Sequence, residues 1–238
     1  MPVKPDRAPL AEDTANGGMA LLVVDMISTW DFPGGDKLGR AARLIAPRIG
    51  ALKQRCDRAR IPVVFVNDNR GRWRSEFREL VAIAAGESET GAAIAESLAP
   101  HDDDYSVLKP KQSAFYATPL DLLLRHLRVK TLLVTGVASD QCVVMTAAEA
   151  RMRDYDVIVP GDCVAAQTDA RNAHALGHLR EAHGIDTAPS ARVRLPRATT
   201  TAKAPANGAK AAHDAKPANG AKAKSVKGKR ARARRTAR

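Results

Sequence analysis

Three residues whose side chains can do chemistry follow strand-like apolar runs in this sequence. Asp25 comes after MALLVV, Lys109 ends YSVLK, and Cys142 comes shortly after TLLVTG. A thiolate can attack a carbonyl carbon, a carboxylate can accept the thiol proton, and a nearby cation favours the charged form of the thiol. Backbone N–H groups in the turn from Gly136 to Cys142 could bind the resulting oxyanion. These residue types therefore predict acyl transfer by a nucleophilic cysteine.

Cys142 falls where a helix is expected to begin. Residues 131–135 have the composition of a buried strand, Gly136 ends it, and AAEARMRD further on is typical of a helix. Ser139 or Asp140 is a candidate N-cap. Unpaired N–H groups in a first helical turn favour negative charge, so the pKa of a thiol there is expected to fall. The alternative is a buried, unreactive cysteine, because free cysteine is among the most buried residue types.

Strand-like and helix-like segments alternate along the middle of the chain. The strand-like runs are residues 19–25, 61–68, 105–109, 131–136 and 155–162. The helix-like segments are residues 39–60, with Pro47 at a break or kink, 118–128, with Thr118 as N-cap and Pro119 first in the helix, 141–154 and 168–184. This alternation predicts an α/β fold, a three-layer α/β/α domain with a mostly parallel sheet. A sixth, edge strand is expected near residues 191–195.

The parallel sheet predicts where the candidate residues lie. Ligands of such sheets bind beyond the carboxyl ends of the strands, so Asp25, Lys109 and Cys142 are expected on one rim. Each has a plainer reading when taken alone: Asp25 could only cap a strand end, and Lys109 could be a solvated charge. Lys111 is an alternative to Lys109 as the cation.

Three segments resemble the isochorismatase-like cysteine hydrolase superfamily over about residues 18–190. They are LLVVDMISTW, VLKPKQSAFYATPLDLLL and TLLVTGVASDQCVVMTAAEARMRDYDVIVPGDCVAA. The family pattern Gly-Val-x-[Ser/Thr]-x-x-Cys-Val matches residues 136–143, its aspartate matches Asp25, and its lysine, four residues before Ser-Ala-Phe, matches Lys109. The resemblance implies a triad of Asp25, Lys109 and Cys142 in a Rossmann-like sheet of about six strands. It also implies an oxyanion site at the backbone of Ala138 and Cys142, with a cis peptide bond before Ala138.

The resemblance also bears on cofactors and substrate. Nicotinamidases of the superfamily bind a metal through an Asp-x-His motif and a further histidine near the second strand, whereas NDNRGRWRSEF follows that strand here. We therefore expect no metal and no other cofactor. True isochorismatases generally lack the cysteine, so Cys142 favours cleavage of the C–N bond of a small amide, ureido or carbamoyl substrate through a thioester intermediate. Candidate pocket walls, each of which could equally be an ordinary core residue, are Trp30, Phe32, Trp73, Phe115 and Tyr116.

Charge and composition divide the chain into a body and two polar ends. Residues 197–238 contain thirteen Lys or Arg residues and one acid, a net charge of +12 that equals the net charge of the whole chain. Few large apolar side chains occur there or in residues 1–17. The loss of conformational entropy on ordering these segments would therefore exceed the free energy gained by burying them. We expect a disordered N-terminal arm at 1–17, a hydrolase domain at 18–196 and a disordered basic tail at 197–238.

The basic tail suggests a second class of function. Its Lys and Arg residues could bind phosphate backbones through counterion release, without reading base sequence, because no aromatic residue is interleaved. The alternative to an enzyme is therefore a nucleic-acid-associated protein whose hydrolase-like domain is a scaffold. An alternative of equal standing to nucleic-acid binding is that the tail only increases solubility.

Cysteine usage and hydropathy bear on the compartment. Cys56, Cys142 and Cys163 are an odd number without a CxxC pair, which argues against a disulfide framework and against a cysteine-based metal site. No apolar run approaches the roughly 18 residues of a membrane span. We expect a cytoplasmic protein that acts on a small molecule, forms a homo-oligomer and does not bind membranes.

Overall fold

A parallel sheet of six strands organises the chain. The computed structural model describes residues 18–71 and 73–197, so the predictions for residues 1–17 and for the tail beyond Arg197 lie outside the described residues. The strands are β1 Met19–Val24, β2 Val63–Asp68, β3 Tyr105–Lys109, β4 Thr131–Val137, β5 Asp156–Ile158 and β6 Val164–Ala165. Their order is β3-β2-β1-β4-β5, with β6 also paired to β4. Every pairing is parallel, as the alternation of segments predicts.

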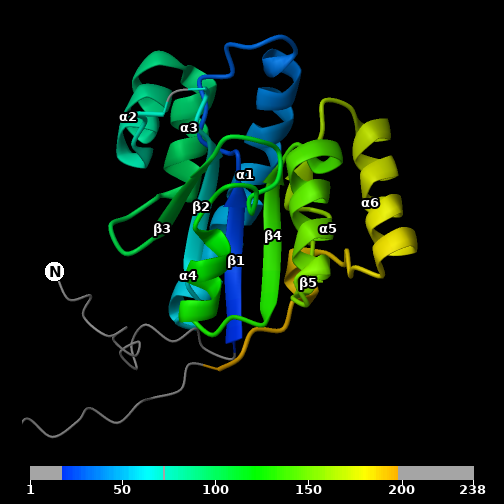
Figure 1. The fold of residues 1–238 in the computed structure, drawn as a ribbon. Helices are drawn as coiled ribbons and strands as arrows, with labels where there is room; N and C mark the ends of the chain where they lie inside the picture. The colour runs from blue at the N-terminus through cyan, green and yellow to red at the C-terminus, as the bar shows by residue number, and fades with distance from the viewer. Residues whose placement is uncertain (1–17, 72, 198–238) are drawn as a thin grey trace, which may run out of the picture. The chain divides into compact units, whose positions relative to one another are not determined.

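Helices cover both faces of this sheet (Figure 1). They are α1 Gly35–Arg58, α2 Phe77–Glu87, α3 Glu89–Leu98, α4 Leu120–His126, α5 Val144–Met152 and α6 Asp169–His183. A π-helical turn, η3 Ser139–Val143, precedes α5, and a 3-10 turn, η4 Ser190–Arg192, follows α6. The three-layer α/β/α prediction is therefore confirmed. Among the described helices, none is both long enough and apolar enough to cross a membrane.

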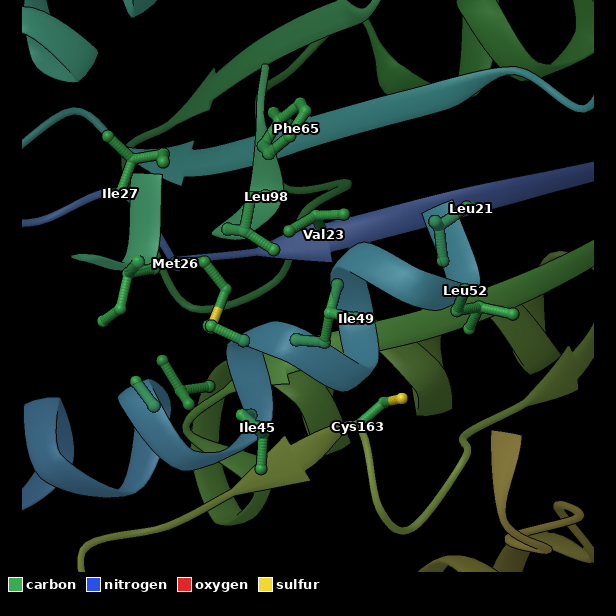
Figure 2. Close-up of a cluster of buried hydrophobic side chains, with 14 of the residues drawn as sticks. Leu21, Val23, Met26, Ile27, Ile45, Ile49, Leu52, Phe65, Leu98 and Cys163 are labelled. Atoms are coloured by element: carbon green, nitrogen blue, oxygen red, sulfur yellow. The ribbon is translucent and has the colours of Figure 1, made fainter. Parts of the chain in front are cut away.

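The alternation of side chains along β1 separates two hydrophobic cores. Leu21 and Val23 pack with residues of α1 and α3, as Figure 2 shows for part of this core. Ala20, Leu22 and Val24 face the other way, toward α4, α5 and α6. All six residues of β1 are buried, which is expected of a central strand with helices on both faces.

The sixth strand is not where the sequence predicted it. Residues 191–195 form no strand, and the sixth strand is β6, which pairs with Gly136 and Val137 of β4. The guanidinium of Arg55 on α1 donates hydrogen bonds to the carbonyls of Ser190 and Val193, at 2.7 and 2.6 Å. Backbone acceptors that a strand would use in pairing are therefore held by a side chain.

Helix α1 is longer than predicted, and α2 and α3 were not predicted. Pro47 lies inside α1, which runs on through it. Pro47 and Arg43 are both exposed. The carbonyl of Arg43, which loses its N–H partner at Pro47, can therefore be hydrated.

The parallel register brings the carboxyl ends of four strands to one edge. Val24 lies opposite Val66 of β2 and Gly136 of β4, and Asp68 lies opposite Lys109. Gly136 has φ +106, and a Cβ there would lie 2.0 Å from the carbonyl oxygen of Val24. The close approach of β1 and β4 at this edge therefore requires glycine.

We expect Gly136→Ala to lower the free energy of unfolding by about 3 kcal/mol or more, because it combines a backbone clash with an unfavourable φ. The matched control is Gly177→Ala in α6, where a Cβ would meet only side-chain atoms at 3.9 and 4.0 Å. That change should raise the free energy of unfolding by about 0.5 to 1 kcal/mol, because alanine is the better helix former. Urea denaturation of the three proteins tests both, and equal stability of Gly136→Ala and the parent would contradict the expectation.

Candidate active site

Asp25, Lys109 and Cys142 meet at the carboxyl edge of the sheet. The ammonium Nζ of Lys109 lies 2.8 Å from Oδ2 of Asp25 and 3.5 Å from Sγ of Cys142. The three residues come from the end of β1, the end of β3 and the turn η3 after β4. The parallel strand order thus brings these three residues together, although they lie far apart in the sequence.

Asp25 is fixed by the strands on either side of it. Its backbone N–H donates to the carbonyl of Val66 at 2.8 Å, and its Oδ1 accepts from the backbone N–H of Asp68 at 2.7 Å. The residue has φ +50, a conformation uncommon for any residue other than glycine. With Oδ1 held by β2, the carboxylate presents Oδ2 to Lys109.

Lys109 is fully buried, and all three donors of its ammonium have an acceptor in reach. Besides Asp25 and Cys142, the carbonyl of Lys111 accepts from Nζ at 3.1 Å. The carboxylate of Asp68 lies further away, at 3.9 Å. Lys111, the other candidate cation, is exposed, and it is its backbone oxygen that contacts the site.

Cys142 lies in the π-helical turn that follows a cis peptide bond between Val137 and Ala138. The carbonyl of Ala138 accepts from the N–H groups of Gln141 and Val143, at 3.0 and 3.1 Å. Ala138 is the N-cap of this turn, and no side chain caps it. Neither Ser139 nor Asp140 therefore has the capping role that the sequence suggested.

The thiol of Cys142 does not have the lowered pKa that its place at a helix start predicted. Burial, and after it the charge of Asp25, raise the pKa of this thiol to about 12, against the opposing effect of Lys109. Burial likewise raises the pKa of Asp25, opposed chiefly by Lys109. For Lys109, burial alone would lower the pKa, but Asp25 and Cys142 outweigh it and the pKa is raised. Around neutral pH the unliganded site therefore holds a thiol beside an ammonium.

A cavity of about 350 Å³ opens beside Cys142. Its walls are formed by Asp25, Ile27, Ser28, Trp30, Phe32, Leu38, Asn67, Asp68, Arg70, Val137, Ala138, Gln141 and Cys142. Pockets that bind small molecules usually measure roughly 300 to 1,000 Å³, so this one suits a small ligand. Most of its wall surface is apolar.

Two of the five aromatic candidates, Trp30 and Phe32, line this cavity. Phe115 is buried in the core on the other face of the sheet, where it stacks on Tyr155. Trp73 and Tyr116 are largely exposed, and neither lines the cavity.

Arg70 is a wall residue that sequence reasoning missed. Its guanidinium donates to Oγ1 of Thr29 at 2.8 Å and pairs with the carboxylate of Asp31. These two contacts join the loop after β1 to the loop after β2. Asn67, near the end of β2, ties the loop after β1 to that strand, donating to the carbonyl of Ile27 at 2.6 Å. Its charge is visible in NDNRGRWRSEF, the segment that begins at the end of β2.

Within the described ranges, one group of potential metal ligands comes close together: Asp57, His101 and Asp104. The ammonium of Lys53 lies among them, 2.8 Å from Nε2 of His101, 3.1 Å from Asp104 and 3.4 Å from Asp57. A cation of the protein itself thus takes the place that a metal ion would need. None of these residues lines the cavity beside Cys142.

Comparison with known proteins gives the family. Residues 19–189 match the Isochorismatase domain. An uncharacterized isochorismatase family protein of Bacillus subtilis, YaaI, is 38% identical over 157 residues, which make up 66% of this chain and 86% of that protein. The resemblance seen in the sequence is thereby confirmed.

Two similar proteins have names that state an activity. The ureidoacrylate amidohydrolase RutB of Methylorubrum extorquens is 40% identical over 70 residues, 29% of this chain and 28% of that protein. The crystal structure of N-carbamoylsarcosine amidase from Thermoplasma acidophilum superposes with a TM-score of 0.55 and 26% identity, over 74% of this chain and 98% of that one. Since the match to the Isochorismatase domain spans well over half of the sequence, the chain belongs to the isochorismatase domain family.

Proposed function

We propose that this protein is a cysteine hydrolase that cleaves the C–N bond of a small amide, ureido or carbamoyl substrate. The observation that carries the proposal is the placement of one buried ammonium, that of Lys109, within 3.5 Å of both a carboxylate and a thiol. The cavity beside Cys142 supports a small substrate. The names of the two similar proteins, an amidohydrolase and an amidase, support cleavage of a C–N bond.

In the first half of the proposed reaction, Asp25 accepts the proton of the Cys142 thiol while sulfur attacks the carbonyl carbon of the substrate. The carbonyl oxygen becomes an oxyanion, for which we propose the backbone N–H groups of Ala138 and Cys142 as donors. The protonated Asp25 then gives its proton to the leaving nitrogen. The C–N bond breaks, ammonia or an amine departs, and a thioester remains on Cys142.

In the second half, water attacks the thioester carbon and gives its proton to Asp25. The C–S bond breaks, the acid is released, and Asp25 gives its proton to the sulfur, which restores the thiol and the carboxylate. Lys109 stays cationic throughout and stabilises the thiolate whenever it forms. The raised pKa values of Asp25 and Cys142 suit this cycle, because they make the carboxylate a stronger base and the thiolate a stronger nucleophile.

We expect Cys142→Ser to reduce turnover by a factor on the order of 10² or more, because Asp25 is too weak a base to deprotonate a serine hydroxyl. Ammonia release from a panel of amides, ureides and carbamates measures it. The control is Cys163→Ala, a buried cysteine outside the cavity, which should keep its activity. Retention of most activity by Cys142→Ser would exclude the cysteine mechanism.

We expect Asp25→Asn to abolish hydrolysis and yet to speed alkylation of Cys142. Removing the carboxylate removes a charge that raises the pKa of the thiol and leaves Lys109 beside it. If the pKa of the thiol falls by one unit, its reaction with iodoacetamide near pH 8 should become about tenfold faster. Peptide mass spectrometry follows alkylation at Cys142 separately from the two other cysteines, and a slower reaction would contradict this electrostatic account.

We expect chelators to leave hydrolysis unchanged. The segment after β2 offers no histidine, and Lys53 lies among the carboxylates and the histidine that come close together elsewhere. Activity assayed before and after incubation with EDTA tests this. Loss of activity that zinc or iron restores would overturn the assignment of a metal-independent reaction.

A further inference from the structure

The loop of residues 110–118, which joins β3 to α4, contributes directly to the candidate site. Its Lys111 carbonyl is one of the three acceptors around the ammonium of Lys109. A shift of this loop would therefore change the environment of a buried charge. Lys109 precedes the loop at the end of an edge strand that, among the strands the structure describes, pairs only with β2, so the loop needs support from outside the sheet.

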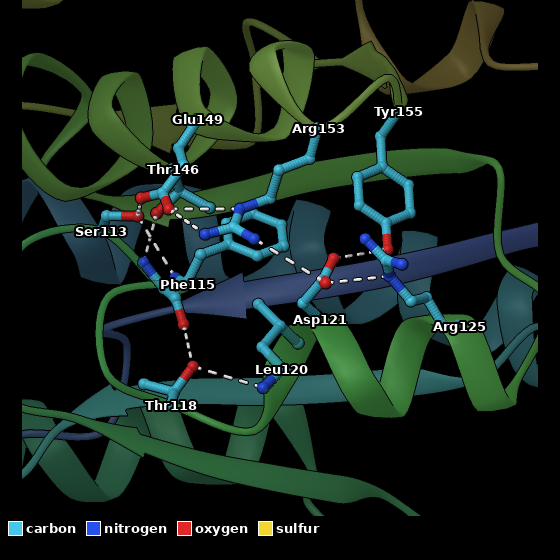
Figure 3. Close-up of polar contacts among 11 residues, drawn as sticks. Ser113, Phe115, Thr118, Leu120, Asp121, Arg125, Thr146, Glu149, Arg153 and Tyr155 are labelled. Atoms are coloured by element: carbon cyan, nitrogen blue, oxygen red, sulfur yellow. Dashed lines mark hydrogen bonds and ion pairs between the residues drawn. The ribbon is translucent and has the colours of Figure 1, made fainter.

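Helix α5 supplies that support. It continues the turn that carries Cys142, and its residues Thr146 and Glu149, three positions apart, lie on one helix face. Oγ1 of Thr146, which is fully buried, accepts from the backbone N–H of Ala114 at 3.0 Å. The carboxylate of Glu149 accepts from the hydroxyl of Ser113, as Figure 3 shows.

Glu149 is itself held from its other side. Arg153 donates from Nε and Nη2 to Oε1 of Glu149, at 3.2 and 2.6 Å, which leaves Oε2 for Ser113. The guanidinium of Arg153 also lies over the ring of Phe115, 5.0 Å from its centroid. Ser113 and Ala114 are thus bonded to α5, and Phe115 contacts Arg153, the residue that follows this helix.

These contacts go beyond what packing of the loop requires. Valine has almost the shape of threonine and would fill the buried position 146 without a polar atom. The hydroxyl of Thr146 is therefore explained by the N–H of Ala114, which would otherwise be buried without a partner. Likewise, the carboxylate of Glu149 joins a residue of the loop to Arg153, the residue that follows its own helix.

We propose that Thr146 and Glu149 are positioning residues. They hold the loop 110–118 against α5, the helix that follows Cys142, and thereby keep the ammonium of Lys109 next to the thiol of Cys142. They act through the loop: α5 fixes Ser113 and Ala114, the loop places the carbonyl of Lys111, and that carbonyl with Asp25 and Cys142 fixes Lys109. The proposal concerns the arrangement of the triad and holds for any substrate.

The test is the pH profile of Cys142 alkylation in the full chain, read by peptide mass spectrometry, together with the thermal unfolding temperature. In Thr146→Val and Glu149→Ala the thiolate should lose part of its interaction with Lys109. We expect alkylation at pH 8 to slow by about three- to tenfold, tenfold being one pKa unit, and the profile to move to higher pH. Thr146→Ser, which keeps the hydroxyl, should restore the profile of the parent.

The matched control is Tyr155→Phe. It removes the hydrogen bond that Tyr155 donates to Asp121 at 3.1 Å, in the same polar network, and keeps the ring beside Phe115. This variant should unfold at a lower temperature and keep the alkylation profile of the parent. A purely structural role for Thr146 and Glu149 predicts the same outcome for their variants, so lower stability with an unchanged or faster alkylation would overturn the proposal.

If Thr146→Val does not fold, Ser113→Ala takes its place. It removes the contact with Glu149 from the side of the loop, at a partly exposed position, and should slow alkylation in the same direction. No hydrolysable substrate enters the experiment. Failure of the proposed hydrolase function and failure of the positioning role would therefore be seen separately.

Discussion

The structure around the cavity depends on one buried ammonium. A charge removed from water costs several kcal/mol unless it is paired and its donors are satisfied. Lys109 meets both conditions, because Asp25, Lys111 and Cys142 take its three donors. Lys109 ends one strand, and its partners come from the end of a second strand, a loop and a helical turn, so burying this charge requires that all four segments meet.

Burial, together with the charge of Asp25, explains why the pKa of the thiol is raised although its place in the helix suggested a lowered one. A helix start favours a thiolate through partial charges and unpaired N–H groups, an effect limited to about the first turn. Burial and a full negative charge on Asp25 act in the opposite direction and prevail. The proton therefore stays on sulfur until something lowers the cost of removing it. In the proposed reaction, attack on the substrate does so, because the negative charge moves from sulfur to the carbonyl oxygen.

The sequence predicted those parts of the fold and of the site that depend on local pattern. Buried strands and the polar residues directly after them are visible as composition, and the rule for parallel sheets brings their ends together. The two-residue β6 has no periodicity to detect and exists only through its pairing with β4. Helices α2 and α3 contain Gly86 and Gly91, and glycine inside a segment lowers its predicted tendency to form a helix. Yet a Cβ at Gly91 would lie 2.4 Å from the carbonyl oxygen of Ala84, so this glycine allows the two helices to touch.

Residues with positive φ shape the rim of the cavity, and the sequence analysis did not predict them. Asp25, Trp30 and Arg70 all have positive φ, at 50, 64 and 54°. Local hydrogen bonds hold the last two, from the N–H of Trp30 to Ser28 Oγ at 3.0 Å and from the N–H of Arg70 to Asp68 Oδ1 at 2.6 Å.

These turns place wall residues from two loops around the same cavity as a cysteine that a third segment supplies. The triad itself lies on the sheet and on a helix start, whereas most of the surrounding wall belongs to loops. Loops tolerate substitution better than the elements they connect. Changes in the walls can therefore alter which substrate fits while the buried ammonium and its partners stay in place.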